Sequence, residues 1–415
     1  MVTFEFAKNI IFNKIKKLNR EKVNILSSIN RIIDENIKSK YNLPNFDNSA
    51  MDGYAVRSID TIGAARENPV KLKIIDVIPA GKDSKVKIVK NTAALIATGA
   101  KIPKGADAVI IKELTKEITE NGEKYVYIYK NVKKYENIRK KGEDVKKGEI
   151  VIKKGSLIRP QEIALLTAIN VTNIYVIKQP KVAILTTGSE LVSPGKKLLN
   201  AKIFDSNSYA IVSFVQKYGG ITKLYGPVKD DKKVIKKFLK KLLENTFDMI
   251  IISGGVSVGN YDFVKDILNE LGVKKLFWKV LIKPGKPFYS GIYKNKFIFG
   301  LPGNPAAVLA LLEMFIRDVL LKMQGKKIPE RIITAYAGEN IQISKGRVNL
   351  IRAKIYLKDG KYLVKPSGKQ SSGMLKSFVD ANALIITSSN KNYLNKGKKV
   401  NVEYLGDWLI KGKEL

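Results

Sequence analysis

Residues 249–262 read MIIISGGVSVGNYD, an apolar run followed by a paired glycine, a third glycine and a carboxylate. The apolar run has the length of a buried strand, and the glycines indicate a turn into the next element. Around it, residues 181–323 alternate strand-length apolar runs with segments that are apolar at helical spacing. This βαβ alternation predicts a doubly wound parallel sheet with helices on both faces. The pattern also predicts a long buried helix from Pro305 to about Lys322.

Shorter β-like stretches lie on both sides of this region. Residues 68–155 contain VKLKIIDVI, TAALIATG and KYVYIYK between charged or glycine-containing turns, which predicts a small β-rich domain. Residues 330–408 return to short strands with turns at KDGK and NKGKK, which predicts a second β domain. A helix is expected over residues 160–170, and an N-terminal helix from about Phe4 to Leu18 is expected to pack in the same part of the chain.

Length and composition limit the classes of protein that remain. A chain of 415 residues, 45% of them hydrophobic, is long for one core and predicts two to four domains. No window approaches an apolar membrane span and the N-terminus lacks a signal-peptide core, so we expect a cytoplasmic protein. With no cysteine and no histidine, thiolate and imidazole chemistry is excluded. A bound metal would be a hard cation held by oxygens, with Mg²⁺ the natural choice beside phosphates.

The charge balance is strongly basic, with 75 Lys and Arg against 38 Asp and Glu and a formal net charge of +37. Such a balance is compatible with an anionic partner or with a lysine-rich solvated surface. The lysines occur in short scattered groups and no nucleic-acid-binding motif accompanies them. These observations favour the solvated surface, and we expect neither nucleic acid nor a membrane as a partner.

In open parallel sheets, ligands bind beyond the carboxyl ends of the strands. Glycine turns follow the predicted strands at these ends. Four turns carry candidate ligand-binding residues: Thr187, Gly188 and Glu190 in TTGSEL; Ser253, Gly254, Gly255, Ser257, Gly259 and Asp262 in SGGVSVGNYD; Lys279, Lys283 and Lys286 in KVLIKPGKP; and Pro302, Gly303 and Asn304 in LPGNP. Taken alone, each glycine turn fits an ordinary strand-to-helix turn as well as a phosphate cradle, and a single lysine is usually only solvated. Lysines on proline-stiffened turns beside two other glycine turns favour an oxyanion-binding site.

The β-rich first half contains a further unusual stretch, NLPNFDNSAMDGYAV at residues 42–56. Each polar residue in it fits an Asx-type loop that caps a strand. The grouping of Asp47, Asn48, Ser49 and Asp52 is more than one turn requires. The stretch is therefore a second candidate for a functional loop.

The motifs NSAMDGYAV, ATGAKIPKGADAVI, ENIRKKGEDV, RPQEIALL, ILTTGSEL, DSN, SGGVSVGNYD, IKPGKPF and LPGNP occur in this order between about residues 5 and 410. Together they resemble the MoeA family of molybdopterin molybdenumtransferases, and the central region is similar to a MogA/MoaB-type molybdopterin-binding domain. The resemblance implies four domains: a segmented N-terminal domain at residues 1–45 and 145–178, an inserted β-rich domain at 46–144, the central α/β domain at 179–327, and a C-terminal β-barrel-like domain at 328–415. It also implies a homodimer whose active sites are shared between the central domain of one subunit and the inserted domain of the other.

The activity implied by the resemblance is insertion of molybdate into adenylylated molybdopterin, with release of AMP and with Mg²⁺ assisting. Carried over to matching positions, the catalytic residues are Asp52, Glu190, Asp262, Lys279 and Lys283. The implied metal ligands are Glu190, Asp230 and Asp262. Thr98, Arg139 and Asp144 are the binding residues of the inserted domain, the glycine-turn residues and Lys286 those of the central domain, and Ser371 or Ser372 the C-terminal contribution.

Several alternatives stay open at this point. Molybdopterin adenylyltransferase activity is the nearest, because stand-alone proteins resembling the central domain carry out that earlier step. Tungstate insertion is another, since molybdate and tungstate are tetrahedral dianions of similar size. A scaffolding protein, a basic nucleic-acid binder and contact with other proteins of molybdenum cofactor biosynthesis are further possibilities.

Overall fold

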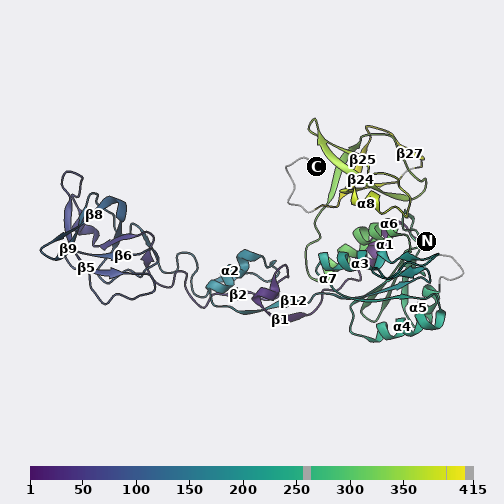
Figure 1. Cartoon of the computed structure of the whole chain (residues 1–415), viewed down its shortest axis with the longest axis horizontal. Helices are drawn as coiled ribbons and strands as arrows, with labels where there is room; N and C mark the ends of the chain where they lie inside the picture. Colours follow the sequence, from purple (N-terminus) through teal and green to yellow (C-terminus); the bar gives the residue numbers. More distant parts are fainter. Residues whose placement is uncertain (256–262, 389, 407–415) are drawn as a thin grey trace. The chain divides into compact units, whose positions relative to one another are not determined.

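The computed structural model describes residues 1–255, 263–388 and 390–406. The chain divides into two compact units, coloured along the sequence in Figure 1. The first unit consists of Met1–Glu21, Asn30–Ile32 and Ile177–Leu415, and the second of Lys22–Ile29 and Ile33–Val176. Within the described ranges, no helix is both long and apolar enough to cross a membrane.

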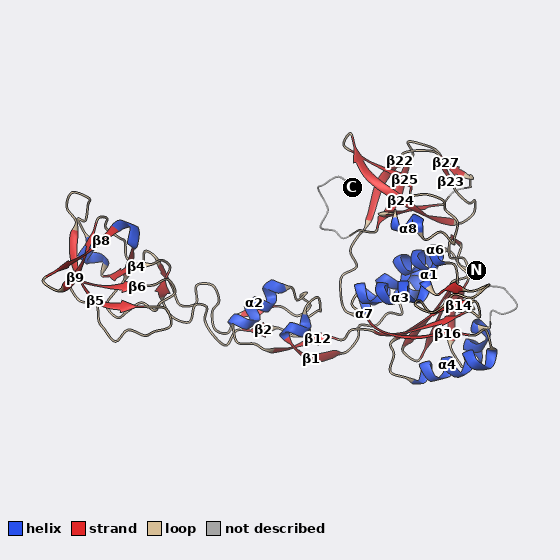
Figure 2. Ribbon diagram, in the orientation of Figure 1, coloured by secondary structure: helices blue, strands red, loops and turns tan. Residues whose placement is uncertain are grey.

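A six-stranded sheet, which includes the β16 labelled in Figure 2, forms the centre of the first unit. Its strand order is β16-β13-β17-β21-β20-β18. Its strands are β13 (Lys181–Thr187), β16 (Ile221–Val228), β17 (Met249–Ser253), β18 (Lys274–Trp278), β20 (Tyr289–Tyr293) and β21 (Lys296–Leu301). The pairs β13–β16, β13–β17 and β17–β21 are parallel, which confirms the predicted parallel sheet. The antiparallel pairs β21–β20 and β20–β18 were not predicted. Two residues separate β20 from β21, too few for the crossover that a parallel pair requires.

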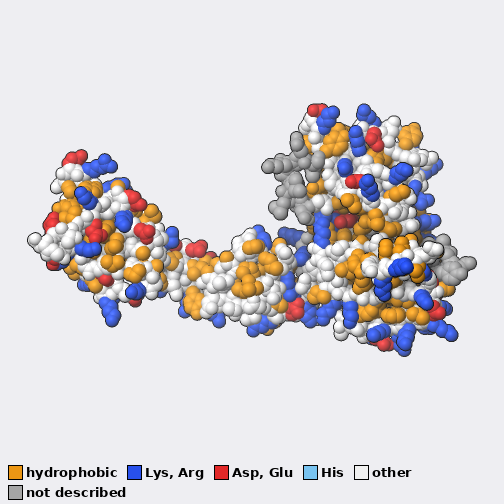
Figure 3. All heavy atoms as spheres, in the orientation of Figure 1, with side chains coloured by type: hydrophobic (Ala, Val, Ile, Leu, Met, Phe, Trp, Pro, Cys, Tyr) orange, Lys and Arg blue, Asp and Glu red, His pale blue; other side chains and the backbone are white. Residues whose placement is uncertain are grey.

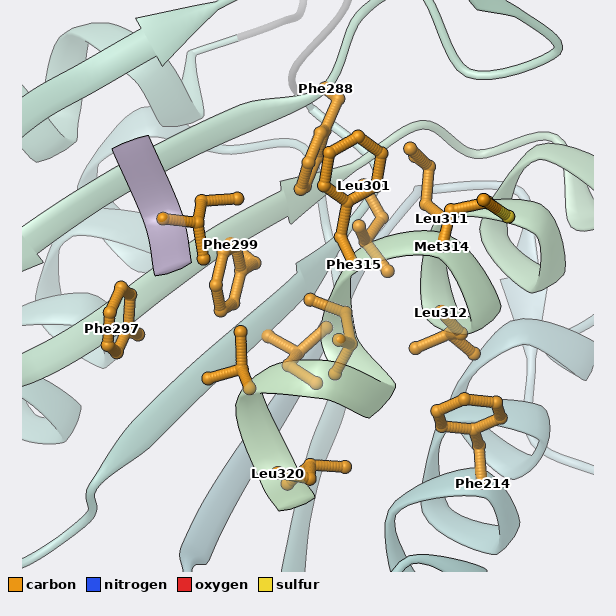
Figure 4. Close-up of a cluster of buried hydrophobic side chains, with 14 of the residues drawn as sticks. Phe214, Phe288, Phe297, Phe299, Leu301, Leu311, Leu312, Met314, Phe315 and Leu320 are labelled. Carbon is orange, nitrogen blue, oxygen red and sulfur yellow. The ribbon is translucent and has the colours of Figure 1, made fainter. Parts of the chain in front are cut away.

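Helices cover both faces of this sheet, as the sequence predicted. The helices are α1 (Phe4–Phe12), α3 (Ser206–Lys217), α4 (Lys232–Glu244), α5 (Val264–Glu270), α6 (Pro305–Leu311) and α7 (Arg317–Met323). One hydrophobic cluster joins the sheet to α3, α6 and α7, and a second joins its other side to α4 and α5. Figure 4 shows part of the first cluster, where the rings of Phe288, Phe299 and Phe315 pack together.

The long closing helix is confirmed, with one irregularity. Between α6 and α7 the residues Leu312–Ile316 form a π-helical segment. Nearly all side chains from Ala306 to Met323 are buried, as expected for a helix that is apolar on almost every side. A π segment inside an α-helix re-aims the side chains that follow it.

The prediction for the N-terminal helix is wrong in both length and location. Helix α1 ends at Phe12, and the chain beyond it is polar, with Asn13 as C-cap. Phe4, Ala7 and Ile11 form a stripe along α1 that is buried in the cluster containing α7, and the ring of Phe4 packs edge-on against Phe315. The stripe packs against an apolar surface formed by residues that are distant in sequence. Periodicity predicts that a helix has an apolar face, but not which surface that face contacts.

The second β domain closes into a barrel in the first unit. Its elements are β19 (Ile282–Lys283), β22 (Ile332–Ala337), β23 (Ile341–Gln342), β24 (Val348–Lys358), β25 (Lys361–Pro366), α8 (Lys376–Val379), β26 (Ala383–Thr387), β27 (Tyr393–Leu394) and β28 (Lys399–Tyr404). The ladder β24-β25-β22-β28-β26 returns to β24, so the sheet has no free edge at that seam. Asp359 and Gly360, both with positive φ, make the predicted KDGK turn between β24 and β25.

The second unit is mostly β structure. Its elements are β1 (Arg20–Asn24), β2 (Ile37–Lys38), β3 (Asn48–Ser49), β4 (Gly53–Val56), β5 (Val70–Ile78), β6 (Thr92–Ile96), β7 (Ala108–Ile111), β8 (Thr115–Glu120), β9 (Glu123–Ile128), β10 (Ile138–Arg139), β11 (Ile150–Ile152), α2 (Pro160–Ala168) and β12 (Asn173–Ile177). Six strands form one sheet in the order β7-β4-β6-β5-β9-β8. Separate clusters lie on its two faces, with Tyr54 and Val56 in one and Ala55 in the other. This alternation along β4 confirms the predicted β-rich domain.

The strand order of the central sheet determines where a ligand can bind. From β13 the chain goes to β16 on one side and then to β17 on the other. The helices that follow β13 and β17 pack on opposite faces of the sheet. Such a reversal opens a crevice outside the carboxyl ends of the two strands. The glycine turns TTG and SGG begin at this crevice.

Candidate active site

A cavity of about 1200 Å³ lies in the first unit, between the strand ends of the central sheet and the barrel. It brings together fourteen of the residues that the sequence singled out: Thr187, Gly188, Glu190, Asp230, Ser253, Gly254, Gly255, Lys283, Lys286, Pro302, Gly303, Asn304, Ser371 and Ser372. These residues come from segments up to 185 positions apart, because the parallel strands end at one edge of the sheet. Ser257, Gly259 and Asp262 lie outside the described residues.

The paired glycine is required by the close approach of Thr187 to Gly254 and of Val264 to Gly255. A Cβ on Gly254 would lie 2.3 Å from the Thr187 carbonyl oxygen, and one on Gly255 would lie 3.1 Å from the Thr187 Oγ1. Both glycines have positive φ, at 94° and 67°. A larger residue at Gly254 would therefore displace the backbone at the end of β13. The turn thus forms part of the cavity wall.

Two of the acidic residues that line the cavity, Glu190 and Asp230, lie on neighbouring strand-end loops. The Ser189 amide donates to Asp230 Oδ2 at 2.8 Å, and the Asp230 amide donates to Ser189 Oγ at 3.0 Å. These two bonds tie the loop after β13 to the loop after β16. Glu190 is exposed in the same loop as Ser189. The arrangement presents one free and one hydrogen-bonded carboxylate to the cavity.

The lysine turn contributes positive charge from the barrel side. Lys283 and Lys286 line the cavity, and Lys283 Nζ donates to Ser344 Oγ at 2.8 Å. Lys279 does not line the cavity; its ammonium lies 4.1 Å from the centre of the Trp278 ring. Its four-residue spacing from Lys283 would place the two on one face of a helix, but this segment is extended and turned, so the side chains separate.

Arg352 is a cavity residue that the sequence reasoning missed. It is 1% exposed, and its guanidinium donates to the backbone carbonyls of Lys369, Gln370 and Ser371. Burial lowers the pKa of this guanidinium. The hydrogen bonds hold the loop that carries Ser371 against the cavity. A single arginine inside the apolar strand VNLIRAKI was the signal available in the sequence.

Asp205 and Asn207, from the DSN motif, are two further cavity residues without an assigned role in the sequence prediction. Asp205 is 2% exposed, caps α3 through the Ser208 amide and accepts from Thr186 Oγ1 at 2.8 Å. Asn207 Nδ2 donates to Ser253 Oγ at 3.0 Å and to the Gly303 carbonyl at 2.8 Å. The motif therefore joins the start of α3 to the turns around the cavity.

In the second unit, Asp52 and Thr98 are in direct contact. The Thr98 amide and Oγ1 donate to Asp52 Oδ1 at 2.7 and 2.9 Å. These hydrogen bonds lower the pKa of the Asp52 carboxyl, the backbone amide most strongly. Arg139, at the end of β10, and Asp144 are both exposed. The sequence named all four residues, and the structure brings Asp52 and Thr98 together.

The fold and the cavity define a class of protein: a small-molecule-binding α/β domain with glycine turns at its strand ends, joined to a barrel and a β-rich unit. Sequence profiles agree with each part. The MoeA N-terminal region (domain I and II) matches residues 2–170, the probable molybdopterin binding domain matches 183–322, and the MoeA C-terminal region (domain IV) matches 334–405.

Individual relatives show the same family over most of the chain. The molybdopterin molybdenumtransferase of Staphylococcus aureus (strain COL) is 35% identical over 90% of this chain and 88% of its own length. That of Nostoc sp. (strain PCC 7120) is 35% identical over 95% and 92%. The crystal structure of a molybdopterin biosynthesis moea protein from Pyrococcus horikosii is 32% identical, with a TM-score of 0.80 over 98% of this chain and all of that one. The chain belongs to the MoeA family of molybdopterin molybdenumtransferases.

Proposed function

We propose that this protein inserts molybdate into adenylylated molybdopterin and releases AMP, giving the molybdenum cofactor. One observation carries the proposal beyond family membership. The lysine turn of Lys283 and Lys286 and the carboxylates of Glu190 and Asp230 line one cavity, together with the glycine turns. A site for two anions needs cationic groups to attract them, and carboxylates belong there when a cation is bound as well.

Each side of the cavity has a distinct role in this proposal. Lys283 and Lys286 hold the molybdate dianion through charge-assisted hydrogen bonds. The cavity-lining Ser253–Gly255 turn binds the phosphate and pterin end of the substrate. The Ser371 loop, fixed by Arg352, closes the barrel side of the cavity. The phosphate linkage to AMP is cleaved with both anions already in place, which lowers the entropic part of the barrier.

Mg²⁺ is the cation that suits this donor set. It prefers oxygen ligands and is commonly bound by one or two carboxylates beside phosphates. Glu190 and Asp230 would hold it, and the described residues contain no group of three or more acidic side chains for a larger cage. When bound, it supplies charge stabilisation to the phosphate oxygens. Asp262, the third ligand predicted from the sequence, lies outside the described residues.

AMP release is the direct test of the proposed function. Wild type and the variants Glu190→Gln, Asp262→Ala and Lys283→Met are given adenylylated molybdopterin, molybdate and Mg²⁺. We expect each variant to lose at least about tenfold in rate, whereas Glu244→Gln, an exposed acid at the end of α4, retains full activity. Full activity of both acid variants at low Mg²⁺ would contradict the proposed roles of the acids.

Two further arms of the same assay separate the alternatives. Release of pyrophosphate from ATP and molybdopterin would show adenylyltransferase activity instead. Parallel reactions with molybdate and tungstate measure metal preference. The expected outcome is AMP release from the adenylylated substrate, with no pyrophosphate formed from ATP.

We also propose that the protein is a homodimer with shared active sites, to which the second unit of the partner subunit contributes. The pair of Asp52 and Thr98 supports this role. Thr98 holds the Asp52 carboxylate in place, although both residues are exposed and neither belongs to the hydrophobic core. Mixing inactive Asp52→Asn with inactive Glu190→Gln protein should restore partial activity, because some mixed dimers contain one intact site. No recovery after subunit exchange, confirmed by tagged co-purification, would contradict shared sites.

We also propose several features that follow from the family resemblance. The four domain boundaries, a cytoplasmic location and contact with other proteins of molybdenum cofactor biosynthesis are among them. Figure 3 shows Lys and Arg side chains spread over the visible face rather than gathered in one stripe, which supports a solvated basic surface. Binding to DNA that falls steeply with salt would instead indicate a nucleic-acid partner.

A further inference from the structure

Asn207 connects two glycine turns of the cavity that follow the paired strands β17 and β21. It lies in the first turn of α3, and its Nδ2 donates to Ser253 Oγ at 3.0 Å and to the Gly303 carbonyl oxygen at 2.8 Å. Ser253 ends β17, whereas Gly303 follows β21. One side-chain amide therefore spans three segments that meet at the carboxyl edge of the sheet.

The orientation of this amide is determined by its two partners. The Gly303 carbonyl oxygen only accepts hydrogen bonds, so a reversed amide would bring two acceptor oxygens together. With Nδ2 committed in this way, Asn207 Oδ1 is buried and accepts no hydrogen bond from the described residues. A buried acceptor without a partner is uncommon and destabilising. The two bonds donated by Nδ2 offset the cost of this unpartnered oxygen.

The start of α3, which carries Asn207, is itself held in place by hydrogen bonds. Asp205, two residues earlier, caps α3 through the Ser208 amide and accepts from Thr186 Oγ1. Thr186 is in β13, next to the Thr187 that packs against Gly254. The helix start, the end of β13 and the two turns thus form one connected arrangement around the cavity.

We propose that Asn207 is a positioning residue that sets the spacing between the Ser253–Gly255 turn and the Pro302–Asn304 turn, and thereby the fit of the pterin and phosphate end of the substrate. This inference rests on the proposed function for the identity of the ligand. Its geometrical part stands on the two hydrogen bonds alone. The two turns bind the substrate in both its ground and transition states. Loss of the two Asn207 hydrogen bonds therefore weakens substrate binding more than it slows the chemical step.

The test compares wild type, Asn207→Ala, Ser253→Ala, the double variant and Asn207→Leu, which keeps the branched shape without hydrogen bonding. Asn269→Ala, an exposed asparagine of α5 outside the cavity lining, is the matched control. AMP release gives kcat and KM for adenylylated molybdopterin. Amide hydrogen exchange in the absence of substrate reports on the turns, above all at Gly254, whose amide donates to the Leu301 carbonyl.

We expect Asn207→Ala and Asn207→Leu to raise KM about tenfold with kcat within about twofold, and to speed exchange at Gly254 while the middle of α3 is unchanged. The double variant should resemble Asn207→Ala, since both single changes remove the same bond. Unchanged exchange at Gly254, or additive effects on KM, would overturn the proposal. If wild type releases no AMP, the proposed function fails, and the exchange data still decide whether Asn207 positions the turns.

Discussion

The Asp52 carboxylate is exposed, and its Oδ1 accepts two hydrogen bonds from one residue, Thr98. They lower the pKa of Asp52 below its ordinary value of 3.8, so the group is ionised throughout the neutral range. An ionised acid held in one orientation is what a shared polar site requires. The contact is specific to the fold, since 46 positions separate the two residues.

Replacing Thr98 by valine tests this contact. The change removes the Oγ1 donor and leaves the amide donor, so we expect the pKa of Asp52 to rise part of the way towards 3.8. The stabilising contribution of Asp52, present above its unfolded pKa and lost as the pH falls, should shrink. Carboxyl-carbon NMR titration measures the pKa, with Thr119→Val on exposed strand β8 as control. An unchanged Asp52 pKa would contradict the assignment.

Gly254 and Gly303 provide a second comparison at the residue scale. Alanine at Gly254 would place its Cβ 2.3 Å from the Thr187 carbonyl oxygen with φ at +94°, whereas a Cβ at Gly303 meets nothing within 4 Å. We expect Gly254→Ala to lower the free energy of unfolding by about 2 kcal/mol or more, and Gly303→Ala by less than about 0.5 kcal/mol. Urea denaturation measures both. Equal effects would show that the glycine pair is not required sterically.

At the scale of elements, the N-terminal caps of α3 and α4 differ in what they hold. Asp205 accepts from the Ser208 amide and Asp231 from the Val234 amide, the same local arrangement. Asp205 is buried and also accepts from the buried Thr186 Oγ1, whereas Asp231 is exposed. One cap therefore only starts a helix, and the other also joins the helix to β13.

This difference predicts unequal costs of removing the two caps. Asp231→Ala should destabilise by about 1 kcal/mol, the usual value of an N-cap. Asp205→Ala should cost about 2–4 kcal/mol, because it also leaves a buried hydroxyl without its partner. Chemical denaturation of both variants measures the difference. Equal losses would mean that the bond from Thr186 contributes nothing to stability.

At the scale of the whole first unit, a buried charge network joins the central domain to the barrel. Arg317 of α7 is 2% exposed and pairs with Glu403 of β28 and with Asp318, while Glu313 lies 3.7 Å away. Arg331 donates to the Tyr218 hydroxyl in the same region. The cavity is lined by both domains, so this network helps to hold the two walls of the site together.

Breaking the network should have a large effect. Arg317→Met leaves the Glu403 carboxylate buried without its partner, and we expect a loss of about 3–5 kcal/mol in the free energy of unfolding. Arg159→Met removes the pair between the exposed Arg159 and the partly buried Glu162, and should cost less than about 1 kcal/mol. Calorimetry of both variants checks the contrast. A small effect of Arg317→Met would show that the buried pair is nearly balanced by its desolvation.

The pH dependence of stability follows from Glu313. Burial raises its pKa above 4.5, and this desolvation outweighs the lowering of the pKa by the nearby Arg317. Arg331, Lys217, Tyr218 and Glu403 also face this group. The folded state therefore holds a proton that the unfolded state loses near pH 4.5, and stability from this group falls as the pH rises above that value. Glu313→Gln should gain stability relative to wild type between pH 4.5 and 7 in urea denaturation; a constant difference would contradict the raised pKa.

The sequence by itself determined the features whose signals are local or ordered along the chain. The βαβ alternation, the long closing helix, the KDGK hairpin and most of the cavity-lining glycine turns follow from periodicity and turn chemistry, because parallel strands end at one edge of a sheet. The order of motifs gave the family, which the sequence profiles confirm.

Only the tertiary structure decided which residues from distant segments meet. It placed α1 against Phe315, set Lys279 apart from Lys283, and joined Asn207 to Ser253 and Gly303. It also buried Arg352 beneath the Ser371 loop. The physical reason is that the spacing of apolar residues along the sequence indicates only which face of a helix or strand is apolar. A hydrogen bond between two turns depends on how the whole chain folds, because the fold decides which turns lie close together.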